Sequence, residues 1–152
     1  MSLHLRPYQH RIAAAVSASI LKRDGLTFTV EIARQGGKNE ISAALELWEL
    51  VTHGAWGGTI IKASPTFKPQ TIISMDRLKT KMNEYFLNQG VYTTEAGYIL
   101  HFGEARVVFL SADESANVVG HTADILLEID EAQDIGKEKY TKEFRPMGSS
   151  TN

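Results

Sequence analysis

The chain has 152 residues, 43% hydrophobic and 22% charged, with a formal net charge of −2, a composition that fits one globular domain and excludes a disordered or fibrous protein. A net charge near zero provides no basic field over the whole molecule, so any contact with nucleic acid has to be local. The sequence has no cysteine, no signal peptide and no long apolar run; this excludes a disulfide framework and a cysteine-ligated zinc site, and predicts a soluble intracellular protein without a membrane partner.

The first half of the chain predicts a helix, a strand and a second helix. Pro7 suits the first turn of a helix over residues 7–21, whose apolar side chains share one face. Residues 26–33, LTFTVEIA, are mostly apolar and rich in β-branched and aromatic side chains, which predicts a buried strand. Residues 39–52 carry apolar side chains at helical spacing and predict a helix that begins directly after a glycine-rich loop.

The second half alternates in the same way. The predicted elements are a strand at 59–64, a helix at 69–88, a hairpin at 91–102 and strands at 106–112 and 125–130. Strands that alternate with helices predict an α/β fold with a mainly parallel central sheet. The closing residues, EFRPMGSSTN, show neither a closing helix nor a terminal cap, which predicts a chain truncated at its C-terminus.

The glycine-rich loop lies in EIARQGGKNE, residues 31–40, and resembles a phosphate-binding loop, G-x-x-x-x-G-K-[ST], without its first glycine. Such a loop needs inward backbone N–H groups, a glycine for close approach, a helix N-terminus and a lysine for the terminal phosphates. Gly37 supplies the glycine, Lys38 supplies the lysine, and the predicted helix follows directly. Gly36 adds flexibility, and the amide oxygen of Asn39 could bind Mg²⁺ in place of a hydroxyl. Taken alone, the pattern also fits a glycine-rich turn with a solvated lysine.

A second motif lies at the end of the apolar strand ILLEID, residues 125–130. Asp130 ends this strand and Glu131 follows directly. In a phosphate-loop hydrolase the aspartate holds Mg²⁺ and the next glutamate acts as general base for the attacking water. Both carboxylates are expected at the sheet edge where open α/β sheets bind ligands, facing the loop. Two charges at a strand end are also common without any function.

Together these segments resemble the ATPase domain of phage terminase large subunits, the motors that pump DNA into viral capsids. The matching segments are RPYQ (6–9), ARQGGKNE (33–40), ASPTFKPQ (63–70), VVGHTADILLEIDEAQ (118–133) and MGSST (147–151). In that family the loop carries arginine and glutamine before the glycine, as Arg34 and Gln35 do here, and lacks the first glycine. The resemblance implies a single RecA-like P-loop ATPase domain over residues 1–152, built as a three-layer sandwich around a mainly parallel sheet.

The resemblance further implies a site for ATP and Mg²⁺. Tyr8 would stack on the adenine and Gln9 would hydrogen-bond to its edge, although both could simply be first-turn residues of a surface helix. Arg34 could be solvated; beside the phosphates it would stabilise the charge of the transition state together with Lys38, while Glu131 activates water. The predicted nucleotide-binding residues are Tyr8, Gln9, Gln35, Gly36, Gly37, Lys38 and Asn39, and the predicted metal ligands are Asn39 and Asp130.

Coupling and partners are likewise implied by the resemblance. Ser149, Ser150 and Thr151 would sense the γ-phosphate and transmit hydrolysis to the DNA-gripping parts, although they could be an ordinary polar tail. The implied partners are double-stranded DNA, the portal and the small terminase subunit, with a homo-oligomeric ring in the full-length protein, in the cytoplasm of a bacterial host. The lysines at positions 62, 68, 79 and 81 are interpreted as a solvated face and not as a DNA track.

The sequence departs from the family in two places. Val119 stands where many members carry an arginine, just before the glycine that corresponds to Gly120, so an arginine finger toward a neighbouring subunit is in doubt. The metal-binding acidic cluster of the family's nuclease domain has no counterpart in this chain. Two alternatives stay open: a helicase-like, nucleic-acid-dependent ATPase, and a truncated module that binds nucleotide without turnover.

Overall fold

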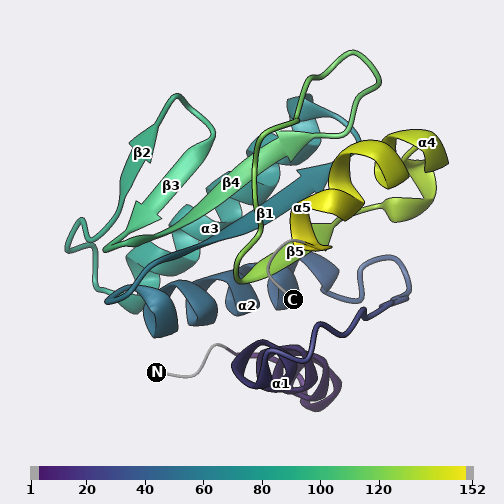
Figure 1. The fold of residues 1–152 in the computed structure, drawn as a ribbon. Helices are drawn as coiled ribbons and strands as arrows, with labels where there is room; N and C mark the ends of the chain where they lie inside the picture. The colour runs from purple at the N-terminus through teal and green to yellow at the C-terminus, as the bar shows by residue number, and fades with distance from the viewer. Residues whose placement is uncertain (1–3, 150–152) are drawn as a thin grey trace.

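A five-stranded sheet in the order β2-β3-β4-β1-β5 organises the chain (Figure 1). In this computed structural model, which describes residues 4–149, the strands are β1 (Gly58–Ser64), β2 (Thr93–Glu95), β3 (Ile99–Phe102), β4 (Ala105–Ser111) and β5 (Leu126–Ile129). β1 pairs in parallel with β4 and β5, and the β2–β3 hairpin adds to β4 in antiparallel fashion. The predicted α/β fold with a mainly parallel sheet is confirmed.

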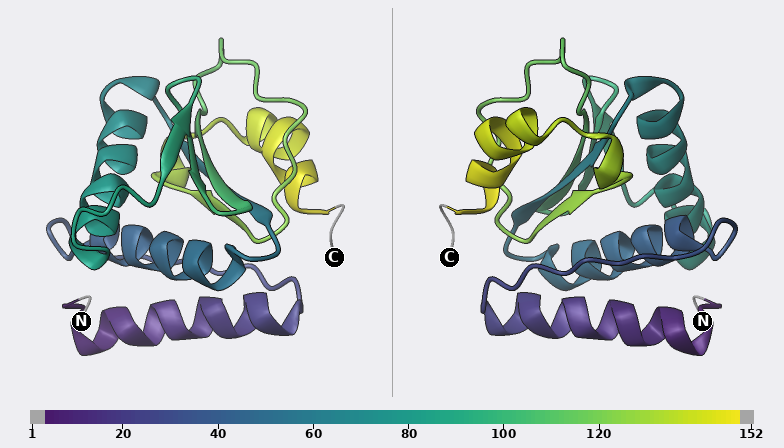
Figure 2. Two further views of the ribbon diagram at one scale, coloured as in Figure 1. Left: turned by 90° about the vertical axis from the view of Figure 1, so that its left-hand side faces the viewer. Right: turned by 90° about the vertical axis from the view of Figure 1, so that its right-hand side faces the viewer.

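Helices cover both faces of this sheet (Figures 1 and 2). α2 and α3 cover one face, the C-terminal helical turns cover the other, and α1 packs on α2 away from the sheet. Among residues 4–149 no helix is both long and apolar enough to cross a membrane. The longer helices are α1 (Pro7–Lys22), α2 (Lys38–His53) and α3 (Ile72–Tyr85). The short turns are η1 (Phe67–Thr71), η2 (Ala132–Asp134), α4 (Lys137–Lys139), η3 (Tyr140–Phe144) and α5 (Arg145–Ser149).

Two apolar cores follow from the alternation of side chains along the strands. Leu50 of α2, Leu78 of α3 and Phe109 of β4 are fully buried on one face. Phe144 and Met147 are buried against the other face. Each of these side chains contributes about 1.5–3 kcal/mol by leaving water, so the two cores hold the helices in place and make the three predicted layers.

The strand predicted at residues 26–33 is wrong. The segment runs extended from the end of α1 back to the start of α2 (Figure 2), but it pairs with no strand among the described residues. Leu26 is 62% exposed, and Phe28 and Val30 are also exposed. A β-rich composition becomes a strand only where a neighbouring backbone accepts its hydrogen bonds, and no such neighbour lies along this segment within residues 4–149.

The expectation that the tail has no closing helix is also wrong. Residues 137–149 are helical throughout, as α4, η3 and α5. The physical reason is the burial of Phe144 and Met147 against the sheet, which compensates for a weak local helix signal. Ser149 ends α5, whereas Ser150 and Thr151, which were predicted to couple hydrolysis to movement, lie outside the described residues.

Candidate functional site

The glycine-rich loop leads directly into α2, whose first residue is Lys38. Gln35 and Gly37 adopt left-handed backbone conformations, with φ of +62° and +78°. No side-chain cap binds the N-terminus of α2 within the described chain, and the first N–H groups of any helix lack intrahelical acceptors. A loop that bends in this way in front of a helix N-terminus is suited to an anion.

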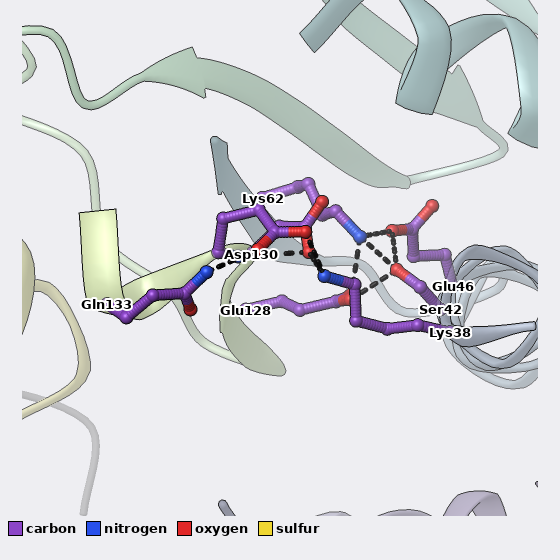
Figure 3. Close-up of polar contacts among 8 residues, drawn as sticks. Lys38, Ser42, Glu46, Lys62, Glu128, Asp130 and Gln133 are labelled. Atoms are coloured by element: carbon purple, nitrogen blue, oxygen red, sulfur yellow. Dashed lines mark hydrogen bonds and ion pairs between the residues drawn. The ribbon is translucent and has the colours of Figure 1, made fainter. Parts of the chain in front are cut away.

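Lys38 lies against the acidic pair at the end of β5 (Figure 3). Its Nζ is 2.9 Å from Asp130 Oδ1 and donates a hydrogen bond to Glu131 Oε1. Partial burial acts to lower the pKa of Lys38, but hydrogen bonds and charge from Glu131 and Asp130 outweigh it and raise the pKa above its ordinary value. The three side chains predicted to converge at one edge of the sheet therefore do so, across 93 residues of sequence.

Glu131 has an unusual backbone for a non-glycine residue, with φ of +48° and ψ of 48°. Its N–H donates to Asp130 Oδ1 at 3.0 Å, and Gln133 donates to its carboxylate. The hydrogen bond from Lys38 is the main cause that lowers the pKa of Glu131, followed by the one from Gln133. The carboxylate is therefore ionised at neutral pH, as a general base requires, and it is held in a left-handed conformation of the kind that clusters at functional sites.

Arg34 and Asn39 lie near this group. Arg34 is exposed, and its positive charge helps to lower the pKa of Glu131, after the larger effects of Lys38 and Gln133. Asn39 follows Lys38 in the first turn of α2 and lines a small polar cavity between α2, β1 and α3. An amide oxygen and a carboxylate oxygen are ligands that Mg²⁺ accepts. The assignment of Asn39 and Asp130 to one Mg²⁺ site stays a prediction.

Tyr8 and Gln9 contact the glycine-rich loop in the structure. The Tyr8 hydroxyl donates to the carbonyl of Gly36, and Gln9 Nε2 donates to the carbonyl of Gly37 at 3.2 Å. Gln9 is 4% exposed, and its Oε1 accepts from the backbone N–H of Arg6 at 2.7 Å. These bonds hold the loop carbonyls toward α1. Recognition of adenine by these two residues stays a prediction.

A second charged cluster, which the sequence did not reveal, lies beneath this site (Figure 3). Lys62 on β1 is 3% exposed, and its Nζ is 2.7 Å from Glu128 Oε1 on β5 and 3.2 Å from Glu46 Oε1 on α2. Lys62 also donates to Ser42 Oγ, and Ser42 donates to Glu128. The interpretation of Lys62 as part of a solvated face is therefore wrong: the side chain points from the sheet toward α2 and is buried there.

The two carboxyl groups of the cluster, Glu46 and Glu128, differ in their protonation. Burial raises the pKa of Glu46 to about 8, and repulsion from Glu128 adds to the rise. Burial acts in the same direction on Glu128, but the closer Lys62 ammonium and the Ser42 hydroxyl lower the pKa of Glu128 below its ordinary value. Lys62 keeps its charge because the two carboxyl groups outweigh its burial and raise its pKa. At neutral pH the cluster therefore holds one cation, one anion and one neutral acid.

One signal in the sequence could have revealed this cluster. Lys62 interrupts the otherwise apolar strand 59–64 at a position that shares a face with Ile60, which belongs to the core. A lysine inside a buried strand requires a carboxylate partner, and Glu128 occupies the corresponding position of the neighbouring strand in the observed register. Only the pairing of β1 with β5 identifies that partner.

A larger hollow of about 680 Å³ lies elsewhere along the same sheet edge. It is formed by the segments that follow β1 and β4, and Lys68, Tyr98, Asp113 and His121 are among its lining residues. None of the predicted nucleotide or metal residues lines it. The chemistry described above is therefore centred on Lys38 and not on this hollow.

Comparison with known proteins supports the fold. No protein-family model matches the chain, and no curated protein matches it. Among solved structures, the crystal structure of the HK97 bacteriophage large terminase is similar, with a TM-score of 0.65 and 19% sequence identity over 84% of this chain. The match covers 26% of the terminase chain, so this chain spans about a quarter of its length. The resemblance to terminase large subunits predicted from the motifs is confirmed at the level of the fold.

Proposed function

We propose that this chain is the ATP-hydrolysing part of a phage terminase large subunit, which uses Mg²⁺ and ATP to move viral DNA. The observation that carries the proposal is the 2.9 Å contact between Lys38, at the start of α2, and Asp130, at the end of β5. The contact supports the proposal because it brings together, in a terminase-like fold, a lysine that would bind phosphate and an acid that would bind Mg²⁺, at the edge of the sheet where such folds bind ligands.

The residues of this edge can divide the work of phosphoryl transfer. Lys38 and the loop amides would bind the β- and γ-phosphates, with Gln35, Gly36 and Gly37 shaping the loop. Asn39 and Asp130 would hold Mg²⁺, which neutralises charge on the phosphate oxygens when it is bound.

Glu131 and Arg34 would act on the reaction itself. Glu131 would orient the attacking water and accept its proton, because the hydrogen bond from Gln133 and the charge of Arg34 still act to lower its pKa after Lys38 has turned away, and the carboxylate stays ionised at neutral pH. Arg34, which is exposed beside it, would stabilise the charge that develops on the transferred phosphoryl group. Lys38 would first have to leave Asp130 and Glu131, so nucleotide binding exchanges an internal ion pair for a phosphate contact.

The larger assembly is part of the same proposal. Double-stranded DNA, the portal and the small terminase subunit would be the partners of the full-length protein, which would act as a ring in the cytoplasm of an infected bacterium. Ser149, Ser150 and Thr151 would couple hydrolysis to the movement of DNA, and Tyr8 and Gln9 would recognise the base.

Binding and turnover of ATP test the proposal. Lys38→Ala should weaken binding of a fluorescent ATP analogue by about 10- to 100-fold, because a charge-assisted phosphate contact is lost. Lys142→Ala is the matched control, because it removes a lysine from an exposed ion pair with Glu138. Glu131→Gln should leave binding in place and reduce hydrolysis by about 10²- to 10⁴-fold.

Each alternative has its own outcome. Equal nucleotide affinity in the wild type and Lys38→Ala, or no binding in either, would refute the proposal. Binding that depends on Lys38 without turnover in any variant would instead support a nucleotide-binding module. DNA-stimulated hydrolysis with strand separation would support the helicase-like alternative.

A further inference from the structure

We infer that Lys62, Ser42 and Glu128 form a junction that positions Asp130 and Glu131 against α2, and that holds them there when Lys38 moves to phosphate. Glu128 is thus a positioning residue that acts through Asp130. The inference rests on the proposed function, because it requires that Lys38 bind nucleotide.

The junction lies below the site and connects the same two elements, α2 and β5. Ser42 lies four residues after Lys38, so both side chains project from the same face of α2. Glu128 lies two residues before Asp130, so both side chains project from the same face of the sheet. The Lys38–Asp130 contact at the surface and the Ser42–Glu128 hydrogen bond below it therefore connect the same two elements in succession.

Nucleotide binding would release only the first of these connections. The side chain of Lys38 is 37% exposed and lies directly after the loop, so its ammonium can turn toward a phosphate. Lys62 is buried on β1, an interior strand of the sheet, and its three donors have Ser42, Glu46 and Glu128 as partners. Exchange of these partners would leave buried charge unpaired, which costs far more than the rearrangement of an exposed pair.

β5 needs such a restraint because its backbone is held on one side only. It is an edge strand of the described sheet, and residues 126–129 pair with β1, with a further backbone hydrogen bond from Ile125 N–H to Thr59 at 3.1 Å. Asp130 and Glu131 follow immediately after the last paired residue, and Asp130 N–H still donates to Ala63 at 2.9 Å. A shift of β5 along or away from α2 would move both acids together, so the junction fixes the distance between the metal-binding strand and the phosphate-binding helix.

Binding of a fluorescent ATP analogue, measured with EDTA and with excess Mg²⁺, tests this role. If Glu128 positions Asp130, Glu128→Gln should reduce the Mg²⁺-dependent gain in affinity by about 10- to 100-fold, which is typical when a group that orients a metal ligand is lost. Affinity in EDTA should stay within about twofold, since Lys38 and the loop are intact. Ser42→Ala should reduce the same gain less strongly, and it serves if Glu128→Gln does not fold.

The control is Glu95→Gln, which removes an exposed carboxylate from the ion pair with His101 in the distant β2–β3 hairpin and should keep the full Mg²⁺ gain. A Mg²⁺ gain equal to that of the wild type in folded Glu128→Gln and Ser42→Ala would overturn the inference. A parallel loss of affinity with and without Mg²⁺ would overturn it too, because it indicates a general loss of stability. A wild type that binds no nucleotide would refute the proposed function, and the junction's role with it.

Discussion

Replacement of Glu46 by glutamine should change how the stability of this protein depends on pH. Glu46 lies on α2, is 1% exposed and has Lys62 Nζ at 3.2 Å. Burial, with a smaller contribution from Glu128, raises the pKa of Glu46 to about 8 against the attraction of Lys62. Its side chain is therefore protonated in the folded protein at neutral pH.

The raised pKa fixes the sign of the effect. Below the ordinary value of 4.5 the carboxyl group is protonated in both folded and unfolded chains; between 4.5 and about 8 only the folded chain keeps the proton. The free energy of unfolding therefore decreases as pH rises through this window, by up to about 1.4 kcal/mol per pH unit. Because Glu46 titrates together with its neighbours, we expect a total of about 2–5 kcal/mol.

Urea unfolding of the wild type and Glu46→Gln between pH 5 and pH 9 measures this loss. Glutamine is neutral throughout and keeps an acceptor for Lys62 and Ser42, so the variant lacks the pH-dependent penalty. The free energy of unfolding of the variant minus that of the wild type should rise up to about pH 8 and then level off. The total rise corresponds to a difference of about 5–15 °C in melting temperature for a domain of this size.

An exposed glutamate serves as the control. The pKa of Glu138 is lowered by its hydrogen bond with Lys142, so its contribution is complete above the ordinary value and Glu138→Gln should give a flat difference over the same pH range. A flat difference for Glu46→Gln as well would refute the protonated state of Glu46, and with it the charge distribution described for the cluster.

Three further predictions concern the loop and the core. Gly37→Ala should weaken binding of the ATP analogue by about tenfold, because a side chain at φ +78° costs about 1–2 kcal/mol and its Cβ would lie 2.4 Å from Gln9 Nε2; unchanged affinity would contradict the proposed loop geometry. Gln9→Ala should lower stability by about 1–3 kcal/mol through its lost loop hydrogen bonds; a lost preference for ATP over GTP analogues would indicate that Gln9 also reads adenine, whereas equal weakening of both would indicate that it only holds the loop. Phe144→Ala should lower the free energy of unfolding by about 3–5 kcal/mol, because Phe144 is fully buried beneath the C-terminal turns; a loss below about 1 kcal/mol, or one equal to that of the exposed Phe67→Ala, would contradict its role in the core.

Local patterns predicted most of the elements because periodicity records which side chains share a face. The helices α1 and α2, the β2–β3 hairpin and the strands β1, β4 and β5 lie within a few residues of their predicted bounds. The same patterns failed for residues 26–33, where composition favours a strand but no neighbouring strand pairs with it in the described chain. They failed also for the tail, where helix formation depends on the burial of Phe144.

The convergence of Lys38 with Asp130 and Glu131 could be predicted from the two motifs, because the glycine-rich loop marks the start of α2 and the acidic pair marks the end of β5. The strand expected before the loop does not form, so the position of Lys38 at this edge depends on the packing of α2. The cluster around Lys62 could not be predicted in the same way, because its members lie in the middle of their elements, where spacing does not show what covers them.

The sequence by itself determined the class of fold, the positions of the loop and the acidic pair, and the kind of chemistry that they suggest, because these follow from local periodicity and residue type. Only the tertiary structure decided that Lys62 is buried, that Glu46 keeps a proton while Glu128 does not, and that Gln9 holds the loop. Each of these depends on the distance to a group on another element, and that distance exists only once β1, β5 and α2 are packed together.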